Sequence, residues 1–158
     1  MPGFTSQNLL RDDNIEIMKE FCLENIDEIA RDVLQAIKKS PDHAMVIALS
    51  GELGAGKTTL TQTLGRILGV EENMISPTFV IMKRYKLRAS NWNLMIHIDA
   101  YRLKDEKELE ALGWKEMIEN PDNLILIEWP ERVPNIIPKY AYGINLGHVD
   151  EKTRSIDF

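Results

Sequence analysis

The sequence is poor in cysteine, in long apolar runs and in clustered positive charge. It has one cysteine, Cys22, no apolar run of eighteen residues and no tract of lysines and arginines. A lone cysteine excludes an internal disulfide and a cysteine-built metal site, and we expect Cys22 in the core of the N-terminal helices. Because a signal peptide and a membrane-length segment are both missing, we predict a cytoplasmic protein with no membrane partner. The net charge of −6 disfavours a free-standing nucleic-acid binder, so any RNA contact is expected through a partner.

The composition that is present fits an ordinary globular domain. Apolar residues make up 44% of the chain and charged residues 28%, both typical of a soluble globular protein. A chain of 158 residues is long enough for one substantial core. We therefore predict a single domain over 1–158, with an N-terminal extension and helices at 1–43, a motif-bearing core at 44–138 and C-terminal strands at 139–158.

The stretch 51–59, GELGAGKTT, organises the rest of the chain. It fits the phosphate-loop pattern G-x-x-x-x-G-K-[ST] at every required position. The apolar, partly β-branched run 44–50 before it predicts a buried strand. Leucines at helical spacing after it predict a helix that ends at Gly69. Strand, glycine loop and helix form the setting in which this motif binds phosphate.

The residue types in this loop indicate what each one binds. Glycines let successive backbone N–H groups turn inward around an anion, and the helix start near Lys57 adds unpaired N–H groups. The Lys57 ammonium is placed to reach the β and γ phosphates, and the Thr58 hydroxyl to ligate Mg²⁺. The predicted phosphate-binding residues are Gly51, Gly54, Ala55, Gly56, Lys57, Thr58 and Thr59.

Apolar periodicity predicts the remaining elements. Helical spacing favours a helix from Asp13 to Lys39 that is broken near Asn25. Further strands are predicted at 80–87, 94–98, 124–127, 140–147 and 153–157, with a helix at 104–112 and a short helix or turn at 114–118.

Two carboxylates, Asp99 and Glu128, follow two of the predicted buried strands. In open α/β sheets, ligands bind at the carboxyl ends of strands, so both acids are expected near the phosphates. Each is a candidate to hold Mg²⁺ directly, to hold it through water, or to orient the attacking water. A solvated strand end is the simpler alternative for either acid alone.

Several other residues leave two interpretations open. Thr78, after Pro77, either contacts the metal or γ-phosphate as a switch-loop residue does, or simply opens a strand. Arg102 either neutralises phosphate charge or forms a structural ion pair. For His97 we expect a packed role, because it stands on a strand without an evident partner. Trp92, Trp114 and Trp129 lack the grouping of a stacking platform and are expected in the core or at its rim.

Taken together, five stretches resemble the TsaE (YjeE) family of bacterial ATPases. They are GELGAGKTT at 51–59, SPTF at 76–79, HIDAYRL at 97–103 with LEALGW at 109–114, and IEWPERV at 127–133. The resemblance spans roughly 46–138 and is far more specific than the phosphate loop alone. It implies an α/β phosphate-loop NTPase fold in which helices flank a mixed β-sheet.

The resemblance also implies an activity and partners. The family binds ATP and Mg²⁺ and works with TsaB and TsaD in threonylcarbamoyladenosine modification of tRNA, so tRNA is expected only indirectly, through that complex. By match of motif, the catalytic residues are Lys57, Thr78, Asp99 and Glu128. The metal residues are Thr58, Glu128 and Asp99. The adenine contacts are not identified by any of these motifs.

Other functions share the phosphate loop. A small-molecule kinase needs an acceptor pocket and usually an arginine-rich lid, whereas the segment after Lys104 mixes Glu and Lys. A GTPase is disfavoured because no Asn-Lys-x-Asp stretch is present to read guanine. A nucleotide-dependent scaffold without useful turnover stays open. The preferred interpretation is a slow Mg²⁺-dependent ATPase that acts as an accessory switch.

Overall fold

A seven-stranded mixed sheet organises residues 18–158, which are the residues that the computed structural model describes. The strand order is β1-β7-β6-β2-β5-β4-β3. In chain order the elements are β1 (Met18–Phe21), α1 (Ile26–Ala36), β2 (Met45–Gly51), α2 (Lys57–Ile67), β3 (Met82–Lys86), β4 (Leu94–Asp99), α3 (Glu106–Ala111), α4 (Trp114–Glu119), β5 (Asn123–Glu128), the 3-10 turn η2 (Pro130–Arg132), β6 (Tyr142–His148) and β7 (Arg154–Asp157).

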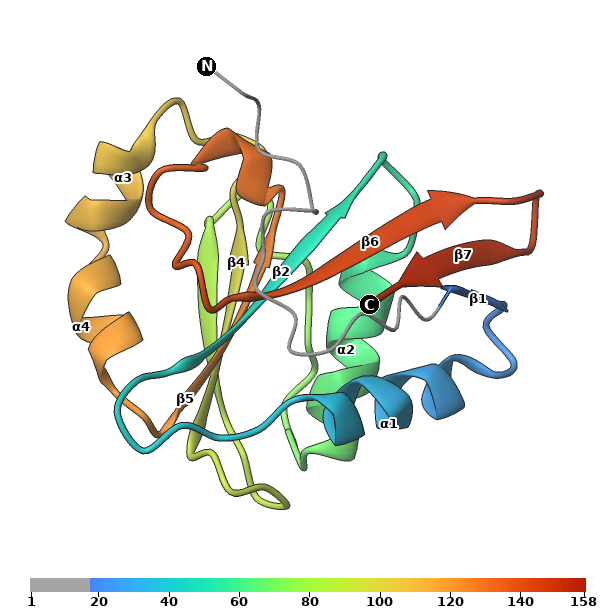
Figure 1. The fold of residues 1–158 in the computed structure, drawn as a ribbon, viewed down its shortest axis with the longest axis horizontal. Coiled ribbons are helices and arrows are strands. Elements are labelled where there is room, and N and C mark those ends of the chain that lie inside the picture. The colour runs from blue at the N-terminus through green and yellow to red at the C-terminus, as the bar shows by residue number, and fades with distance from the viewer. Residues whose placement is uncertain (1–17) are drawn as a thin grey trace.

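The four central strands, β6, β2, β5 and β4, run parallel, and the outer pairs run antiparallel. Helices cover both faces of this sheet, with α1 and α2 on one side and α3 and α4 on the other (Figure 1). This arrangement confirms the predicted α/β class and the mixed sheet.

Strand β2 is apolar over most of its length because both of its faces are covered. Ile47 and Leu49 belong to the core under α1 and α2, whereas Val46 and Ala48 belong to the core under α3 and α4. Successive side chains of a strand point to opposite faces, so a centrally placed parallel strand needs apolar residues on both. The continuous apolar run before the phosphate loop is thereby explained.

The predicted helix from Asp13 to Lys39 is wrong in its first half. Residues 18–21 form β1, which pairs antiparallel with β7, so that Phe21 lies opposite Arg154. A run of four residues is too short for its apolar pattern to distinguish a helix from a strand, and pairing with the free edge of the sheet determines that it is a strand. The part from Asp13 to Ile17 lies outside the described residues. Cys22 is only partly buried, so its predicted core position is also wrong.

The other elements match the predictions with small shifts of their ends. Strand β3 begins at Met82 because the chain turns at Ile81, whose φ is 66°. The backbone N–H of Asp99 donates to the Ile81 carbonyl at 2.8 Å, which ties this turn to the end of β4. Within residues 18–158, no helix has the length and apolar character needed to cross a membrane.

Candidate functional site: the phosphate loop and two acidic strand ends

The phosphate loop leaves the end of β2 in a conformation that only glycine adopts easily. Gly51 has a φ of 141°, and a Cβ at this position would lie 2.4 Å from the carbonyl oxygen of Leu146. Gly56, with a φ of 101°, immediately precedes α2. Between them, the Ala55 N–H donates to the Glu52 carbonyl at 3.1 Å, which closes the loop. The glycines are therefore required by the backbone path itself.

Lys57, the first residue of α2, folds back over the loop. Its Nζ donates to the carbonyls of Gly51 at 2.5 Å and Glu52 at 2.9 Å, and it lies 4.1 Å from the centroid of the Trp129 ring. Burial lowers the pKa of Lys57, although the carboxylates of Glu128, Glu131 and Asp99 oppose that shift. The ammonium is thus only partly satisfied by carbonyl dipoles and an aromatic face, and an anion in the loop would be a better partner.

Thr58 and Glu128 meet across the site. The Thr58 hydroxyl lies 2.9 Å from Oε1 and 3.1 Å from Oε2 of Glu128, the last residue of β5. Oε1 also lies 2.7 Å from Nε2 of His97, a fully buried side chain of β4. A helix start, a strand end and a neighbouring strand therefore converge on one carboxylate.

Asp99 makes a second cluster beside the first. It is paired in register with Glu128 on the neighbouring strand and is only 4% exposed. Its Oδ2 accepts from the Thr78 hydroxyl at 2.7 Å, and its Oδ1 accepts from the Tyr101 N–H at 2.9 Å. The Ser76 hydroxyl lies 2.7 Å from the same Thr78 hydroxyl, so the loop 76–79 is held against the end of β4.

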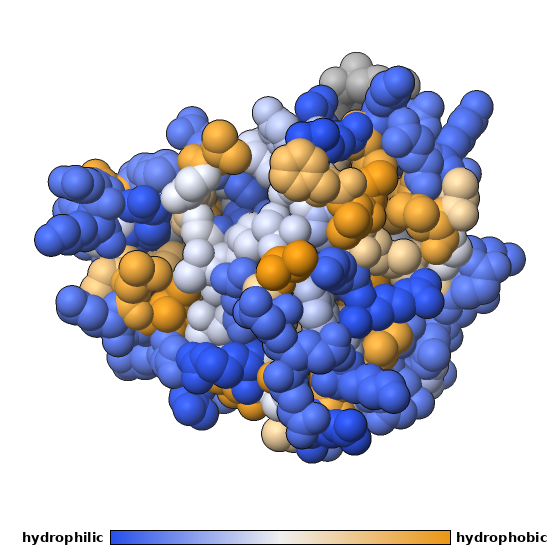
Figure 2. Space-filling model, turned by 180° about the vertical axis from the view of Figure 1, so that it is seen from behind, coloured by the Kyte–Doolittle hydropathy of each residue, from blue (hydrophilic) through white to orange (hydrophobic). Residues whose placement is uncertain are grey.

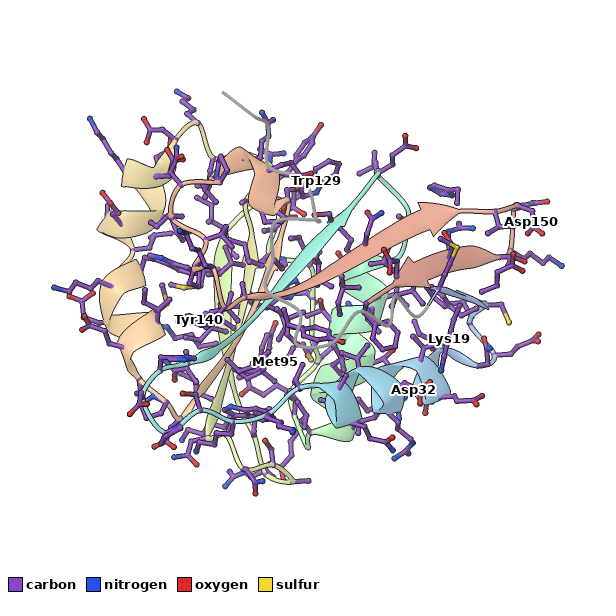
Figure 3. The ribbon with its side chains drawn as sticks, in the orientation of Figure 1. Lys19, Asp32, Met95, Trp129, Tyr140 and Asp150 are labelled. Carbon is purple, nitrogen blue, oxygen red and sulfur yellow. The ribbon has the colours of Figure 1, made fainter. Side chains whose placement is uncertain are left out.

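These groups line a cleft of about 310 Å³. Its walls are Leu53, Gly54, Gly56, Lys57, Thr58, Thr59, Ser76, Thr78, Asp99, Tyr101, Glu128 and Trp129. Trp129 marks this end of the sheet in Figure 3, next to η2. The predicted loop residues Gly51 and Ala55 do not line the cleft; they determine the backbone path of the loop.

A larger cavity of about 720 Å³ also adjoins the loop. It shares Gly54, Gly56 and Thr59 with the cleft and is otherwise lined by 21–24, Ile26 and 151–154. Arg154 in its wall donates from Nε to the Gly54 carbonyl at 3.1 Å. Asp150, labelled in Figure 3, lies at the tip of the β6–β7 hairpin, and residues 151–154 of the same hairpin line the cavity.

The oxygen donors fit a magnesium ion that is shared with phosphate. Among residues 18–158, no group of three or more His, Cys, Asp or Glu side chains forms a cage for a metal. Thr58 and Glu128 offer a hydroxyl and a carboxylate at one point, with Asp99 on the next strand. Mg²⁺ prefers one or two protein carboxylates with waters and phosphate oxygens completing the shell.

The structure thus brings together every predicted catalytic and metal residue: Lys57, Thr58, Thr78, Asp99 and Glu128. His97 was predicted only as a packed residue; it is packed, but it also contacts Glu128. Side chains two apart on a strand share a face, so the spacing of His97 and Asp99 was the available signal. Arg102 stacks over the Phe79 ring at 4.5 Å and is not among the residues that line the cleft, so both of its interpretations stay predictions.

The fold and the loop define the class of this chain: an α/β protein with the phosphate-loop NTPase fold. Its family model identifies it further, because the model described as "Threonylcarbamoyl adenosine biosynthesis protein TsaE" matches residues 23–156. The chain belongs to the TsaE family.

Similar proteins agree with this assignment. A protein of Haemophilus influenzae named tRNA threonylcarbamoyladenosine biosynthesis protein TsaE is 35% identical, over 73% of this chain and 70% of its own length. One of the same name from Nostoc sp. is 37% identical, over 71% of this chain and 68% of its own. The crystal structure of YdiB from Bacillus subtilis has a TM-score of 0.65 and 23% identity, covering 92% of this chain and 87% of that one, and supports the fold.

Proposed function

We propose that this chain is a cytoplasmic, Mg²⁺-dependent ATPase that serves as an accessory switch in threonylcarbamoyladenosine modification of tRNA, acting with TsaB and TsaD. The observation that carries the proposal is the meeting of Lys57, Thr58 and Glu128 at the phosphate loop. The names of the relatives add the pathway. The net charge of −6 fits indirect contact with tRNA, through the partners.

In this proposal, the loop N–H groups and the start of α2 receive the triphosphate. Lys57 exchanges its bonds to the Gly51 and Glu52 carbonyls for the β and γ phosphates. Thr58 and Glu128 would hold the metal, which would neutralise charge on the phosphates. Asp99 and Thr78 orient the attacking water and couple the loop 76–79 to the γ-phosphate.

The base and ribose are proposed to occupy the 720 Å³ cavity beside the loop. Phe21 and Leu23 give that cavity an apolar wall, and the 151–154 segment gives it a polar one. Because it shares Gly54 and Gly56 with the cleft, a nucleotide can span both spaces along the loop. This assignment supplies the adenine contacts that no sequence motif identified.

Turnover by the isolated chain is expected to be slow. Of the described residues, those lining the cleft include no arginine. Arg102 and Arg132 lie over the rings of Phe79 and Tyr101, at 4.5 and 5.5 Å, and so have other partners. An arginine that stabilises transition-state charge is often supplied by a second protein.

The loop 76–79 offers a surface for such a protein. Phe79 is 83% exposed and Val80 56% exposed, although both are apolar. Figure 2 shows hydrophobic groups on the rear face of the molecule among mostly hydrophilic side chains. Because the same loop hydrogen-bonds to Asp99, nucleotide and partner are proposed to favour one arrangement jointly.

The kinase alternative is weakened by the position of α3. The segment from Lys104 would form a lid, yet Leu109 of α3 lies in the core with Trp114, on the sheet face opposite α2. A lid there would not cover the phosphate loop. A scaffold and an ATPase would share this site, so only a measurement of ATP turnover distinguishes them.

The test compares ATP turnover by this chain alone and with TsaB and TsaD, without any phosphate acceptor. We expect slow turnover alone and faster turnover with the pair, with Thr78→Ala losing most of the gain. Thermodynamic coupling is reciprocal, so if the partner strengthens ATP binding by some factor, ATP must strengthen partner binding by the same factor. If the pair neither binds nor alters turnover, the switch role fails, and tight ATP binding without hydrolysis would favour the scaffold.

A further inference from the structure

His97 is a buried polar residue with one ring nitrogen that has no hydrogen-bond partner among the described residues. Its side chain is fully buried, and among the residues that the structure describes its Nδ1 atom has no hydrogen-bond partner. Burial of a polar nitrogen without a partner is unfavourable, so an aliphatic side chain would suit a purely structural position better. The contact at its other nitrogen, Nε2, therefore needs an explanation.

The Nε2 contact fixes which nitrogen carries the proton. Oε1 of Glu128 lies 2.7 Å away, and an ionised carboxylate only accepts hydrogen bonds. A histidine protonated on Nδ1 alone would set a lone pair against that oxygen. His97 therefore donates from Nε2 to Glu128, and Nδ1 is the atom left without a partner.

We propose that His97 is a positioning residue for the metal-binding end of the site, an inference that rests on the proposed MgATP function. Its Nε2–H holds Oε1 of Glu128 and leaves Oε2 to face the metal or a metal-bound water. The Thr58 hydroxyl, within 3.1 Å of both oxygens, then has a fixed acceptor for its proton. With that proton directed at Glu128, the lone pairs of Thr58 are free for the metal.

The location of His97 supports a role in orientation. It stands on β4, whereas Glu128 ends β5 and Thr58 lies in the first turn of α2, so three separate elements are joined through one carboxylate. His97 is absent from the walls of the cleft, so it acts only through Glu128. Partners of this kind, one step removed from a metal, commonly contribute 10- to 100-fold to metal affinity.

Two amide variants separate the donor from the bulk of the side chain. In His97→Gln the amide nitrogen reaches roughly where Nε2 lies, whereas in His97→Asn it reaches only roughly where Nδ1 lies. His97→Leu removes both donors. A control is Asn123→Leu, at the opposite end of β5 from Glu128, which removes a buried hydrogen bond to the Met117 carbonyl.

The measurement is Mn²⁺ binding, followed by electron paramagnetic resonance, in the presence of a non-hydrolysable ATP analogue. We expect His97→Asn and His97→Leu to weaken Mn²⁺ binding about tenfold or more. His97→Gln and Asn123→Leu should stay within about threefold of the wild type, and metal-free nucleotide binding should be nearly unchanged in all four. Each variant's unfolding midpoint is measured in parallel, and if His97→Leu does not fold, the Gln and Asn pair decides.

The positioning role is overturned if Mn²⁺ binding is unchanged in His97→Asn, or if the Gln and Asn variants weaken it equally. Either result would leave His97 a packing residue while the proposed ATPase stands. If the wild-type chain binds neither the nucleotide nor Mn²⁺, the proposed function fails, and this inference fails with it.

Discussion

Replacing Glu128 by glutamine should have opposite effects on ATP binding with and without Mg²⁺. The variant keeps the shape of the side chain but removes one negative charge from a residue that is 3% exposed. Without metal, that charge repels the triphosphate, so its loss should strengthen ATP binding. With metal, the same loss removes an attraction to a divalent cation.

The size of the metal effect follows from the geometry. A cation bound at the Thr58 hydroxyl lies within ~4 Å of the Glu128 carboxylate, where two unit charges attract by ~1 kcal/mol in water and ~4 kcal/mol at an effective dielectric constant of 20. A divalent cation doubles this, but the cleft opens to solvent, so the low end applies. We estimate ~2–3 kcal/mol, or roughly 30- to 150-fold in the Mg²⁺ concentration at half-maximal binding.

The assay is a titration of a fluorescent ATP analogue at fixed Mg²⁺ concentrations and in a chelator, on wild type, Glu128→Gln and Asp99→Asn. Asp99→Asn is the matched comparison, because it also neutralises an acid at the end of a parallel strand. We expect its main effect on turnover, with a smaller shift in Mg²⁺ dependence. An unchanged Mg²⁺ midpoint in Glu128→Gln would show that Glu128 does not hold the metal. Equal shifts in both variants would show that Glu128 and Asp99 do not have separate roles.

Three further outcomes are expected. Lys57→Ala should weaken ATP binding or slow turnover by one to two decades, from the loss of a charge-assisted contact of ~1.5–3 kcal/mol, and should still fold; wild-type hydrolysis would contradict the loop assignment. Because burial lowers the pKa of Lys57 from 10.5, the unfolded chain binds more protons in the alkaline range and this group's contribution to stability rises with pH there. A bound triphosphate should raise the pKa again, so calorimetry in two alkaline buffers should show proton uptake on ATP binding, and uptake unchanged in Lys57→Ala would reject that source. Gly51→Ala would place its Cβ 2.4 Å from a backbone oxygen, whereas Gly113→Ala, at a φ of 86°, would have its nearest contact at 3.5 Å. Gly51→Ala should therefore lower the free energy of unfolding by ~1–3 kcal/mol more than Gly113→Ala. Equal losses in the two variants would show that the clash at Gly51 is not the cause.

The parts of the site that the sequence predicted are those built from local patterns. The phosphate loop is a contiguous motif, and β4 and β5 are short apolar runs that each end in an acid. Because parallel strands end at one edge of a sheet, the sequence alone was enough to place the two acids beside the loop. Asp99 and Glu128 are indeed paired in register.

The parts that escaped prediction depend on long-range pairing. Strand β1 forms because it pairs with the free edge of β7, and the residues 18–21 themselves give no sign of this pairing. The contact between His97 and Glu128 joins residues 31 positions apart, on adjacent strands. The large cavity likewise joins 21–24 to 151–154, and these segments meet only because β1 and β7 are neighbours in the sheet.

A crystal structure of this chain bound to a non-hydrolysable ATP analogue and Mg²⁺ would show whether the phosphate loop and the two acids form one MgATP site. We expect the triphosphate to lie along the phosphate loop, with Lys57 released from the Gly51 and Glu52 carbonyls and bonded to the β and γ phosphates. The metal should lie at the Thr58 hydroxyl, with Glu128 as a ligand directly or through one water, and the base should fill the 720 Å³ cavity. A nucleotide bound elsewhere, or a metal without contact to Thr58 and Glu128, would contradict this expectation.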